Sequence, residues 1–381
     1  MGSVARSFWL ERLERVWKRV PIVWLSGVRR VGKTSLVRQI PKALYLNCDL
    51  PSVAERAADP EQLLSTVRQP TLVLDEIHQL PDPSRLLKIA ADTRPGLRVC
   101  ATGSSTLAAT KKFRDSLTGR KQVVHLVPVL VEELPAFGIA DIRRRLLHGG
   151  LPALLLEDEP DAETYSEWLD SFFARDVQEL FRVEKRAAFL RMVELLLRQS
   201  GGLCEVTSLA RACELSRPTV MSYLDALQIT HVIRLLRPYH GEGRQELLRQ
   251  PKVYAFDTGF VAHARGWNDL RTEDCGLLWE HLVLDSLLSR PAPPEAHFWR
   301  DKSGREVDFV LARGRGVADA IECKWSAKAF SPKALAAFRA LHPKGRNFLV
   351  VPGPKEPFVL RVGELSVTVT DLSGMVAALE K

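Results

Sequence analysis

The sequence predicts an α/β protein of several domains: a parallel sheet covered by helices, a helical connector, a winged helix-turn-helix and a small α/β domain. Short β-rich runs alternate with amphipathic helical stretches from residue 21 to about residue 137. A helix-turn-helix pattern follows, and further strand patterns come after a Leu-rich helix near the last third. Because 381 residues exceed the size at which one core usually keeps growing, we expect four units, at 1–145, 146–199, 200–250 and 251–381.

Five β-rich runs define the expected sheet of the first domain. They are IVWLS (22–26), ALYLN (43–47), TLVLDE (71–76), LRVCATG (97–103) and VVHLVPV (123–129). Helical stretches separate them, an order typical of parallel strands joined by crossover helices. This order makes a nucleotide-binding core the leading interpretation.

Charge and composition narrow the classes of protein. The 54 basic residues outnumber the 46 acidic ones, for a formal charge of +8, and arginine, whose planar fork suits phosphate, outnumbers lysine. This permits a nucleic-acid partner without establishing one. No apolar run approaches the roughly 20 residues of a membrane span, and arginine interrupts the N-terminal stretch where a signal peptide needs an apolar core. We therefore expect a cytoplasmic protein with no membrane partner.

A complete phosphate-loop motif, GVRRVGKT, lies between the first strand and a helix. Gly27 and Gly32 let backbone N–H groups face the phosphates, Lys33 can reach the β and γ phosphates, and the Thr34 hydroxyl can hold Mg²⁺. The flanking strand and helix make a chance Gly-Lys turn a weak alternative. The motif predicts a P-loop NTPase domain with ATP and Mg²⁺ as cofactors, and two further loop residues are expected at the nucleotide: Arg29 and Ser35.

An acidic pair ends the third predicted strand, where a Walker B pair belongs. Asp75 would hold magnesium, and Glu76 would polarise the attacking water. Hydroxyls at the end of the next strand, including Ser104, could orient that water, although a Ser-rich turn is an equal alternative. Arg120 is a candidate arginine finger, while an isolated arginine is more often a solvated surface residue.

A helix-turn-helix with a wing is predicted over 205–240. Apolar residues recur at helical spacing in both helices, and the second helix leaves Arg217, Thr219 and Tyr223 facing outward. Arg244 and Arg249 flank the Gly-rich turn of the expected wing. These five side chains are the predicted DNA contacts. The same module also serves as a protein–protein joint or a rigid lid, so that alternative stays open.

The order of these motifs resembles one family. GVRRVGKTS, NCDLP, LVLDEIH, ATGSS, SLTGR, LVPV and GGLPAL follow one another as in the bacterial and archaeal AAA-type ATPases that carry a DUF4143 C-terminal region, and KVYAFDTGF is similar to a K-x-Y-x-x-D-x-G stretch of that region. The resemblance covers nearly the whole chain. It implies a P-loop ATPase of the additional-strand class, commonly suspected of DNA-linked work.

A second group of charged residues lies near the C-terminus. Asp308 and the Glu322-Cys323-Lys324 stretch look like the D…ExK pattern of restriction-endonuclease-like folds, and strand alternation puts Glu322 and Lys324 on one face. Asp308 and Glu322 would hold Mg²⁺ with Lys324 steering water, and Glu280, on the apolar face of the preceding helix, could complete the metal site. The alternatives are charged residues at the edge of a half-exposed sheet, or a site that binds without cutting.

Two functions remain for the whole chain. The first is an ATP-driven DNA-processing enzyme that repositions a winged helix and a nuclease-like domain. The second is a nucleotide-controlled switch or scaffold acting on a protein partner, with an inactive C-terminal domain. A metabolic kinase is weaker, because Glu76 beside Asp75 suits water as the nucleophile. A homo-oligomeric ring would fit an arginine acting in trans, by analogy with the class.

Overall fold

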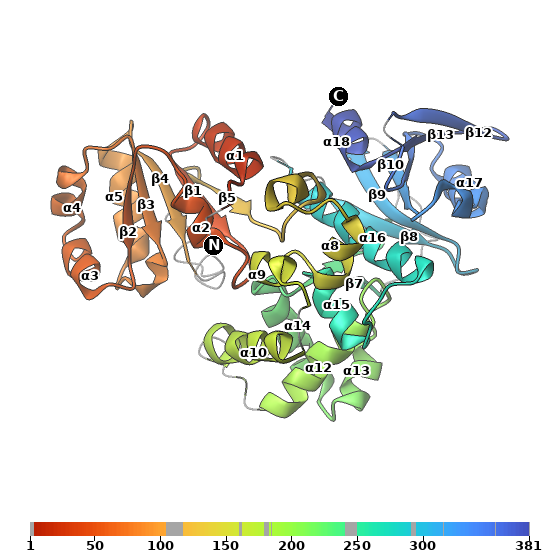
Figure 1. The fold of residues 1–381 in the computed structure, drawn as a ribbon, viewed down its shortest axis with the longest axis horizontal. Coiled ribbons are helices and arrows are strands. Elements are labelled where there is room, and N and C mark those ends of the chain that lie inside the picture. The colour runs from red at the N-terminus through yellow and green to blue at the C-terminus, as the bar shows by residue number, and fades with distance from the viewer. Residues whose placement is uncertain are drawn as a thin grey trace.

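The computed structural model describes residues 4–103, 117–159, 162–178, 183, 185–240, 250–290, 295–314, 316–354 and 356–380. Its first sheet is parallel, in the order β2–β3–β4–β1–β5 (Figure 1). The strands are β1 (Ile22–Ser26), β2 (Ala43–Asn47), β3 (Thr71–Asp75), β4 (Arg98–Thr102) and β5 (Lys121–His125). The strand β4 separates β1 from β3, so the expected P-loop sheet with its additional strand is confirmed. The last run ends earlier than predicted, because the chain leaves the sheet at Leu126.

Helices cover both faces of this sheet, so its central strands are buried completely. On β1, Val23 and Leu25 face one core while Ile22 and Trp24 face the other. Such two-sided burial explains why the run is apolar throughout rather than alternating. The covering helices are α1 (Ser7–Trp17), α2 (Lys33–Val37), α3 (Pro51–Ala57), α4 (Pro60–Thr66) and α5 (Pro83–Thr93), with the short turn η1 (Ile77–Gln79).

The connector is a set of short helices that packs on later parts of the chain. They are η2 (Val131–Phe137), α8 (Ile142–His148), α9 (Pro152–Leu156), α10 (Ala162–Phe172) and η3 (Phe173–Val177). Trp168 of α10 stacks on Phe256 with ring centroids 4.9 Å apart and meets Phe260 edge-on at 4.8 Å. These aromatic contacts fix α10 to the start of the segment that contains Phe256 and Phe260.

Three helices and a two-stranded ribbon follow, and the second and third of these helices lie where the helix-turn-helix pattern predicts two helices. They are α12 (Arg186–Arg198), α13 (Val206–Ala212) and α14 (Arg217–Ile229), with antiparallel β6 (Ile233–Leu236) and β7 (Lys252–Ala255). Ser216 caps α14 by accepting a hydrogen bond from the N–H of Thr219. Because β7 pairs with β6, the predicted boundary at residue 250 divides this ribbon, and the second unit extends beyond it.

A six-stranded mixed sheet, in the order β12–β13–β11–β10–β9–β8, forms the C-terminal part. Its strands are β8 (Ala296–Arg300), β9 (Glu306–Gly314), β10 (Val317–Cys323), β11 (Asn347–Val350), β12 (Phe358–Val362) and β13 (Leu365–Thr370). The accompanying helices are α15 (Thr258–Ala264), α16 (Thr272–Leu288), η4 (Ala327–Ala329), α17 (Pro332–Leu341) and α18 (Leu372–Glu380). No helix in the described ranges is long and apolar enough to cross a membrane.

The connector packs closely against the segment that follows the ribbon. Asp257 caps α15 and accepts hydrogen bonds from the N–H groups of Gly259 at 2.8 Å and Gly150 at 2.6 Å. A Cβ at Gly149 would lie 1.9 Å from an Asp257 oxygen, and Gly149 also has φ +82°. Only glycine fits there, which explains the GG step in the sequence.

Candidate functional sites

The phosphate loop runs from the end of β1 to the start of α2 and depends on backbone shape. Gly27 has φ +151°, and a Cβ there would lie 2.6 Å from the Leu126 carbonyl oxygen. Arg30 and Gly32 also adopt positive φ, at 61° and 100°. These conformations curl the loop around the side chain of Lys33, as the motif predicts.

The Lys33 ammonium lies inside this loop. It donates to the carbonyl oxygens of Gly27 at 2.9 Å and Val28 at 3.1 Å. Burial lowers its pKa, and the carboxylates of Glu76 and Asp75 partly oppose that shift. The Lys33 ammonium therefore lies in the loop and within the field of the Asp75–Glu76 pair. A bound phosphate chain needs a cation at this place.

Asp75 sits at the end of β3 with both carboxylate oxygens engaged. It accepts from the hydroxyl of Thr102 at 2.5 Å and from the hydroxyl of Tyr45 at 2.6 Å. The Thr102 oxygen in turn accepts from the Glu76 N–H at 3.0 Å. Thr102, at the end of β4, thus joins the two acidic residues. A set of hydroxyl and carboxylate oxygens fits a hard cation such as Mg²⁺.

Glu76 follows β3 in a left-handed conformation, with φ 55°. Its carboxylate lies 3.3 Å from Nδ1 of His78. Burial raises the pKa of Glu76, while Lys33 and His78 oppose the shift. A non-glycine residue with positive φ is strained, and such strain at a functional position serves to aim a side chain. The raised pKa makes this carboxylate a stronger base toward water.

The connector reaches the phosphate loop through Arg29. Arg29 donates to the Asp176 carboxylate on η3 at 2.8 Å, and its carbonyl accepts from the Trp168 indole N–H at 3.2 Å. The side chain predicted to contact nucleotide is thus ion-paired to the neighbouring helical segment. The Trp168 contact links the loop to the aromatic stack with Phe256 and Phe260.

Of the remaining residues predicted for the phosphate site, some lie on α2, one lies outside the described residues and one lies away from the loop. Thr34 is half-buried and Ser35 is exposed, both on α2, and Ser104 lies outside the described residues. Arg120 directly precedes β5, at the end of the strands opposite the phosphate loop, where its carbonyl accepts from the Ile22 N–H and its side chain pairs with Asp92 at 2.7 Å. The arginine-finger prediction is therefore wrong for the phosphate site of the same chain. A role toward a neighbouring copy stays a prediction.

A buried polar chain runs from the phosphate loop to the ribbon. The Ser26 hydroxyl, directly before Gly27, lies 2.6 Å from Nε2 of His231, the turn residue between α14 and β6. The His231 ring packs on His125 of β5 with centroids 4.2 Å apart. Burial lowers the pKa of His231 to about 3, so the imidazole is neutral at ordinary pH. No motif marks these residues.

This row of polar side chains continues from the ribbon into the C-terminal part through Arg234 of β6. Its guanidinium lies 3.0 Å from His125 and donates to the Asp285 carboxylate of α16 at 2.7 Å. The buried Arg145 of α8 lies on the other side of Asp285, at 3.8 Å. One row of side chains therefore touches β1, β5, the ribbon, α8 and α16.

The predicted DNA contacts divide into three groups. Arg217 is exposed at the start of α14, and Thr219 is half-buried, with its hydroxyl 2.7 Å from that of Ser216. Tyr223 is buried and packs edge-on against Phe189 at 5.2 Å, so the expectation that it faces outward is wrong. An aromatic ring at this position completes the core between α12 and α14. Arg244 and Arg249 lie outside the described residues.

Three charged residues meet at the C-terminal centre, as the D…ExK pattern predicts. The Lys324 ammonium lies 3.2 Å from Asp308 and 3.1 Å from Glu322. Asp308 also accepts from the Cys323 N–H at 2.7 Å. Burial and then Asp308 raise the pKa of Glu322 to about 8, and one Glu322 oxygen is buried without a hydrogen-bond partner.

Glu280 is held by a second cation that sequence reasoning missed. Lys252 lies 3.4 Å from Glu280 and 2.7 Å from Glu306, and the Tyr254 hydroxyl donates to Glu280 at 2.9 Å. Both partners come from β7. Within the described ranges no three His, Cys, Asp or Glu residues are placed to hold a metal ion together. Lys252 and Lys324 pair with these carboxylates in this arrangement, and the metal cleft expected of Glu280, Asp308 and Glu322 stays a prediction.

Three family models match successive parts of the chain. An AAA domain matches residues 19–135, a domain of unknown function (DUF8612) matches 139–271, and a second domain of unknown function (DUF4143) matches 275–369. An uncharacterised protein of Mycobacterium tuberculosis is 31% identical over 316 residues, covering 80% of this chain and 70% of the relative. One from Haemophilus influenzae is 23% identical, covering 82% and 84%.

Solved structures resemble the chain more distantly. The Walker-type ATPase of Pyrococcus abyssi is 17% identical, covers 69% of this chain and 96% of its own, and superposes with a TM-score of 0.43. Cdc6p of Pyrobaculum aerophilum is 14% identical, covers 70% and 94%, and gives 0.30. At these scores the sheet order and the family matches carry the fold assignment.

Proposed function

We propose, on the premise that this chain belongs to the family of AAA-type P-loop ATPases with a C-terminal DUF4143 region, that it hydrolyses ATP and passes its nucleotide state to a DNA-binding winged helix. The arrangement of Lys33, Asp75, Thr102 and Glu76 around one loop carries the first half of this proposal. The polar chain from Ser26 to His231 supports the second half.

ATP would replace the carbonyl partners of Lys33. Its phosphates accept from the loop N–H groups and from the ammonium, which then leaves the oxygens of Gly27 and Val28. Thr34 and Asp75 would hold Mg²⁺, which supplies charge stabilisation for the leaving phosphate. Glu76, aimed by its left-handed backbone, polarises the attacking water.

ATP turnover tests this assignment most directly. Lys33→Ala should lose ATP affinity and turnover, whereas Glu76→Gln should keep affinity and lose at least about 100-fold in turnover, since only the water-activating group changes. Glu61→Gln, an exposed glutamate on α4, is the matched control. Unchanged turnover in Glu76→Gln would contradict the role given to this carboxylate.

The DNA role rests on the order α12–α13–α14–β6–β7 and on exposed Arg217 at the start of the second helix of the motif. Turnover measured with and without single-stranded, duplex and branched DNA, at one stated salt concentration, separates the two functions. DNA-stimulated turnover that falls in the Arg217→Ala variant supports DNA processing. Unstimulated turnover, with no salt-dependent DNA binding, favours a switch acting on a protein partner.

Phosphodiester hydrolysis at the C-terminal centre is a second candidate. The placement of Lys324 within 3.2 Å of both Asp308 and Glu322 favours it. Duplex and branched DNA incubated with Mg²⁺ or Mn²⁺ provides the test, with Asp308→Asn as the inactivating change and Asp158→Asn, at an exposed position after α9, as control. Cleavage that persists in Asp308→Asn would exclude this centre as its source.

A further inference from the structure

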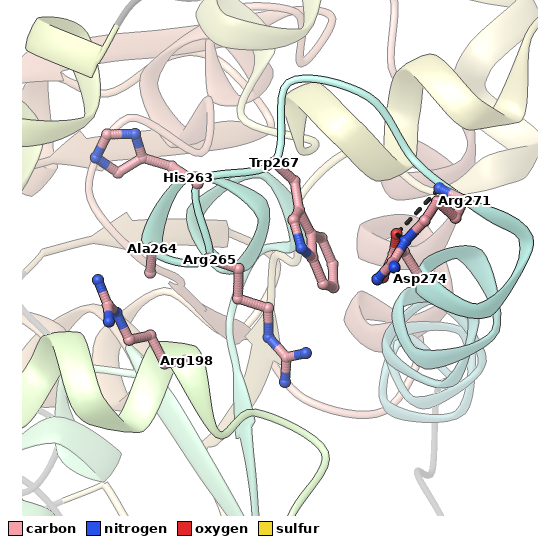
Figure 2. Close-up of a pocket in the computed structure, with 8 residues that line it drawn as sticks. Arg198, His263, Ala264, Arg265, Trp267, Arg271 and Asp274 are labelled. Carbon is pink, nitrogen blue, oxygen red and sulfur yellow. Dashed lines mark hydrogen bonds and ion pairs between the residues drawn. The ribbon is translucent and has the colours of Figure 1, made fainter.

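An open pocket of about 600 Å³ lies at the meeting point of α12, α15 and α16. Arg198 ends α12, Arg265 and Trp267 follow α15, and Arg271 and Asp274 begin α16 (Figure 2). None of these residues belongs to the phosphate loop, to α14 or to the C-terminal carboxylates. The motifs described above do not include them.

The pocket has more positive charge than its carboxylates neutralise. Arg271 and Asp274 form a two-pronged pair, at 2.9 and 3.0 Å, and Arg198 pairs with Glu194 at 3.0 Å. Arg265 has no ion pair within the described part of the chain, and its Nε atom is buried with no hydrogen-bond partner. Asp274 attracts the charge of Arg265 but is already paired with Arg271, so the Arg265 guanidinium can take an anionic ligand.

The Arg265 side chain is already oriented. Its guanidinium lies over the Trp267 ring, 4.9 Å from the ring centroid, and Figure 2 shows Trp267 between Arg265 and Arg271. Stacking on an aromatic face restricts the plane of the guanidinium, so less conformational entropy is lost when its N–H fork meets a ligand.

We propose that this pocket binds a phosphodiester group of a nucleic-acid strand, as a second contact beside that of α14. A planar N–H fork with surplus positive charge matches phosphate oxygens, and an open shape beside an indole ring suits a strand that passes over the surface. The pocket lies on α12, the first helix of the same helical unit as α14. The inference rests on the proposed DNA binding.

The salt dependence of DNA affinity tests this contact. Each lost phosphate contact reduces the slope of log K against log salt by about 0.9, and a charge-assisted hydrogen bond corresponds to roughly tenfold in affinity. Arg265→Gln should show both changes with labelled duplex DNA at several salt concentrations, with basal ATP turnover retained. Arg186→Gln, an exposed arginine at the other end of α12 that pairs with Asp170, should show neither.

The outcomes separate the inference from the function on which it rests. If Arg217→Ala weakens DNA binding while Arg265→Gln leaves affinity and slope unchanged, the pocket is not a DNA contact and the DNA role stands. If Arg265→Gln loses pyrophosphate binding but keeps its DNA affinity, the ligand is a free phosphate compound and the proposal is wrong. If the parent protein binds no DNA, both the DNA role and this contact fall.

Discussion

The phosphate loop and the C-terminal centre both concentrate charge, but they are built differently. The loop depends on the backbone shape of one short segment around one lysine, with Gly27 and Gly32 in conformations that side chains rarely adopt. The centre depends on side chains from β7, α16, β9 and β10, with two lysines distributed among four carboxylates. A local segment can therefore define the first site, whereas the second exists only in the folded chain.

The largest effect should come from removing one cation of the C-terminal centre. Lys252→Met leaves Glu280 and Glu306 without their buried partner, so we expect the free energy of unfolding to fall by about 3 to 5 kcal/mol. Urea unfolding measures this change. Lys328→Met, at an exposed position, should stay within about 0.5 kcal/mol of the parent. Equal stability of the two variants would show that these ion pairs do not compensate buried charge.

The phosphate loop should fail through its backbone instead. Gly27→Ala would place a Cβ against the Leu126 carbonyl and strain the positive φ, so we expect at least a tenfold loss of ATP affinity, about 1.4 kcal/mol. Calorimetric titration with ATP measures it. Gly96→Ala is the control, because a Cβ there meets nothing within 4 Å. Unchanged affinity in Gly27→Ala would mean that the loop shape does not set nucleotide binding.

A pH-dependent effect should appear at His231, on the polar path between the phosphate loop and the ribbon. Its pKa is about 3 in the folded chain, so below pH 6.5 the unfolded chain binds a proton that the folded chain does not. Stability is therefore lost as pH falls, by about 1.4 kcal/mol per unit.

His231→Asn tolerates the left-handed φ of 63° but cannot titrate in this way. His125 and Arg234, which face this position, and the Ser26 hydroxyl remain in both proteins. Unfolding curves of parent and variant from pH 6.5 to pH 4.5 should diverge, with the parent falling more steeply. Parallel curves would show that the His231 proton is not excluded from the folded protein.

The smallest effect is expected at Tyr223. Because the ring packs against Phe189, Tyr223→Phe keeps the packing and should leave DNA affinity unchanged within twofold, about 0.4 kcal/mol. The Arg217→Ala variant, at an exposed position on the same helix, is the comparison. A large loss of DNA affinity in Tyr223→Phe would restore this hydroxyl to the contact surface.

Sequence patterns predicted what depends on short-range order. The five strands, Lys33 in its loop and the Asp75-Glu76 pair all follow from strand composition and from motif spacing. The wrong predictions involve long-range packing. Helical spacing could not tell that Phe189 would cover Tyr223, and no spacing rule connects Lys252 to Glu280 or Ser26 to His231. Arg120 was misplaced because a strand has two ends, and proximity in sequence to a Thr-Gly turn does not say which end faces the nucleotide.

The segment from Lys252 to Gly259 limits how related chains can be recombined. Its first residues, Lys252 and Tyr254, belong to the C-terminal centre, while Asp257 and Gly259 fit against the Gly149-Gly150 step. A chimaera of two relatives must therefore match whichever of these contacts its crossover divides. Crossovers between 151 and 251 would separate Gly149 from Asp257, and only a donor with the same glycine and aspartate would close the junction.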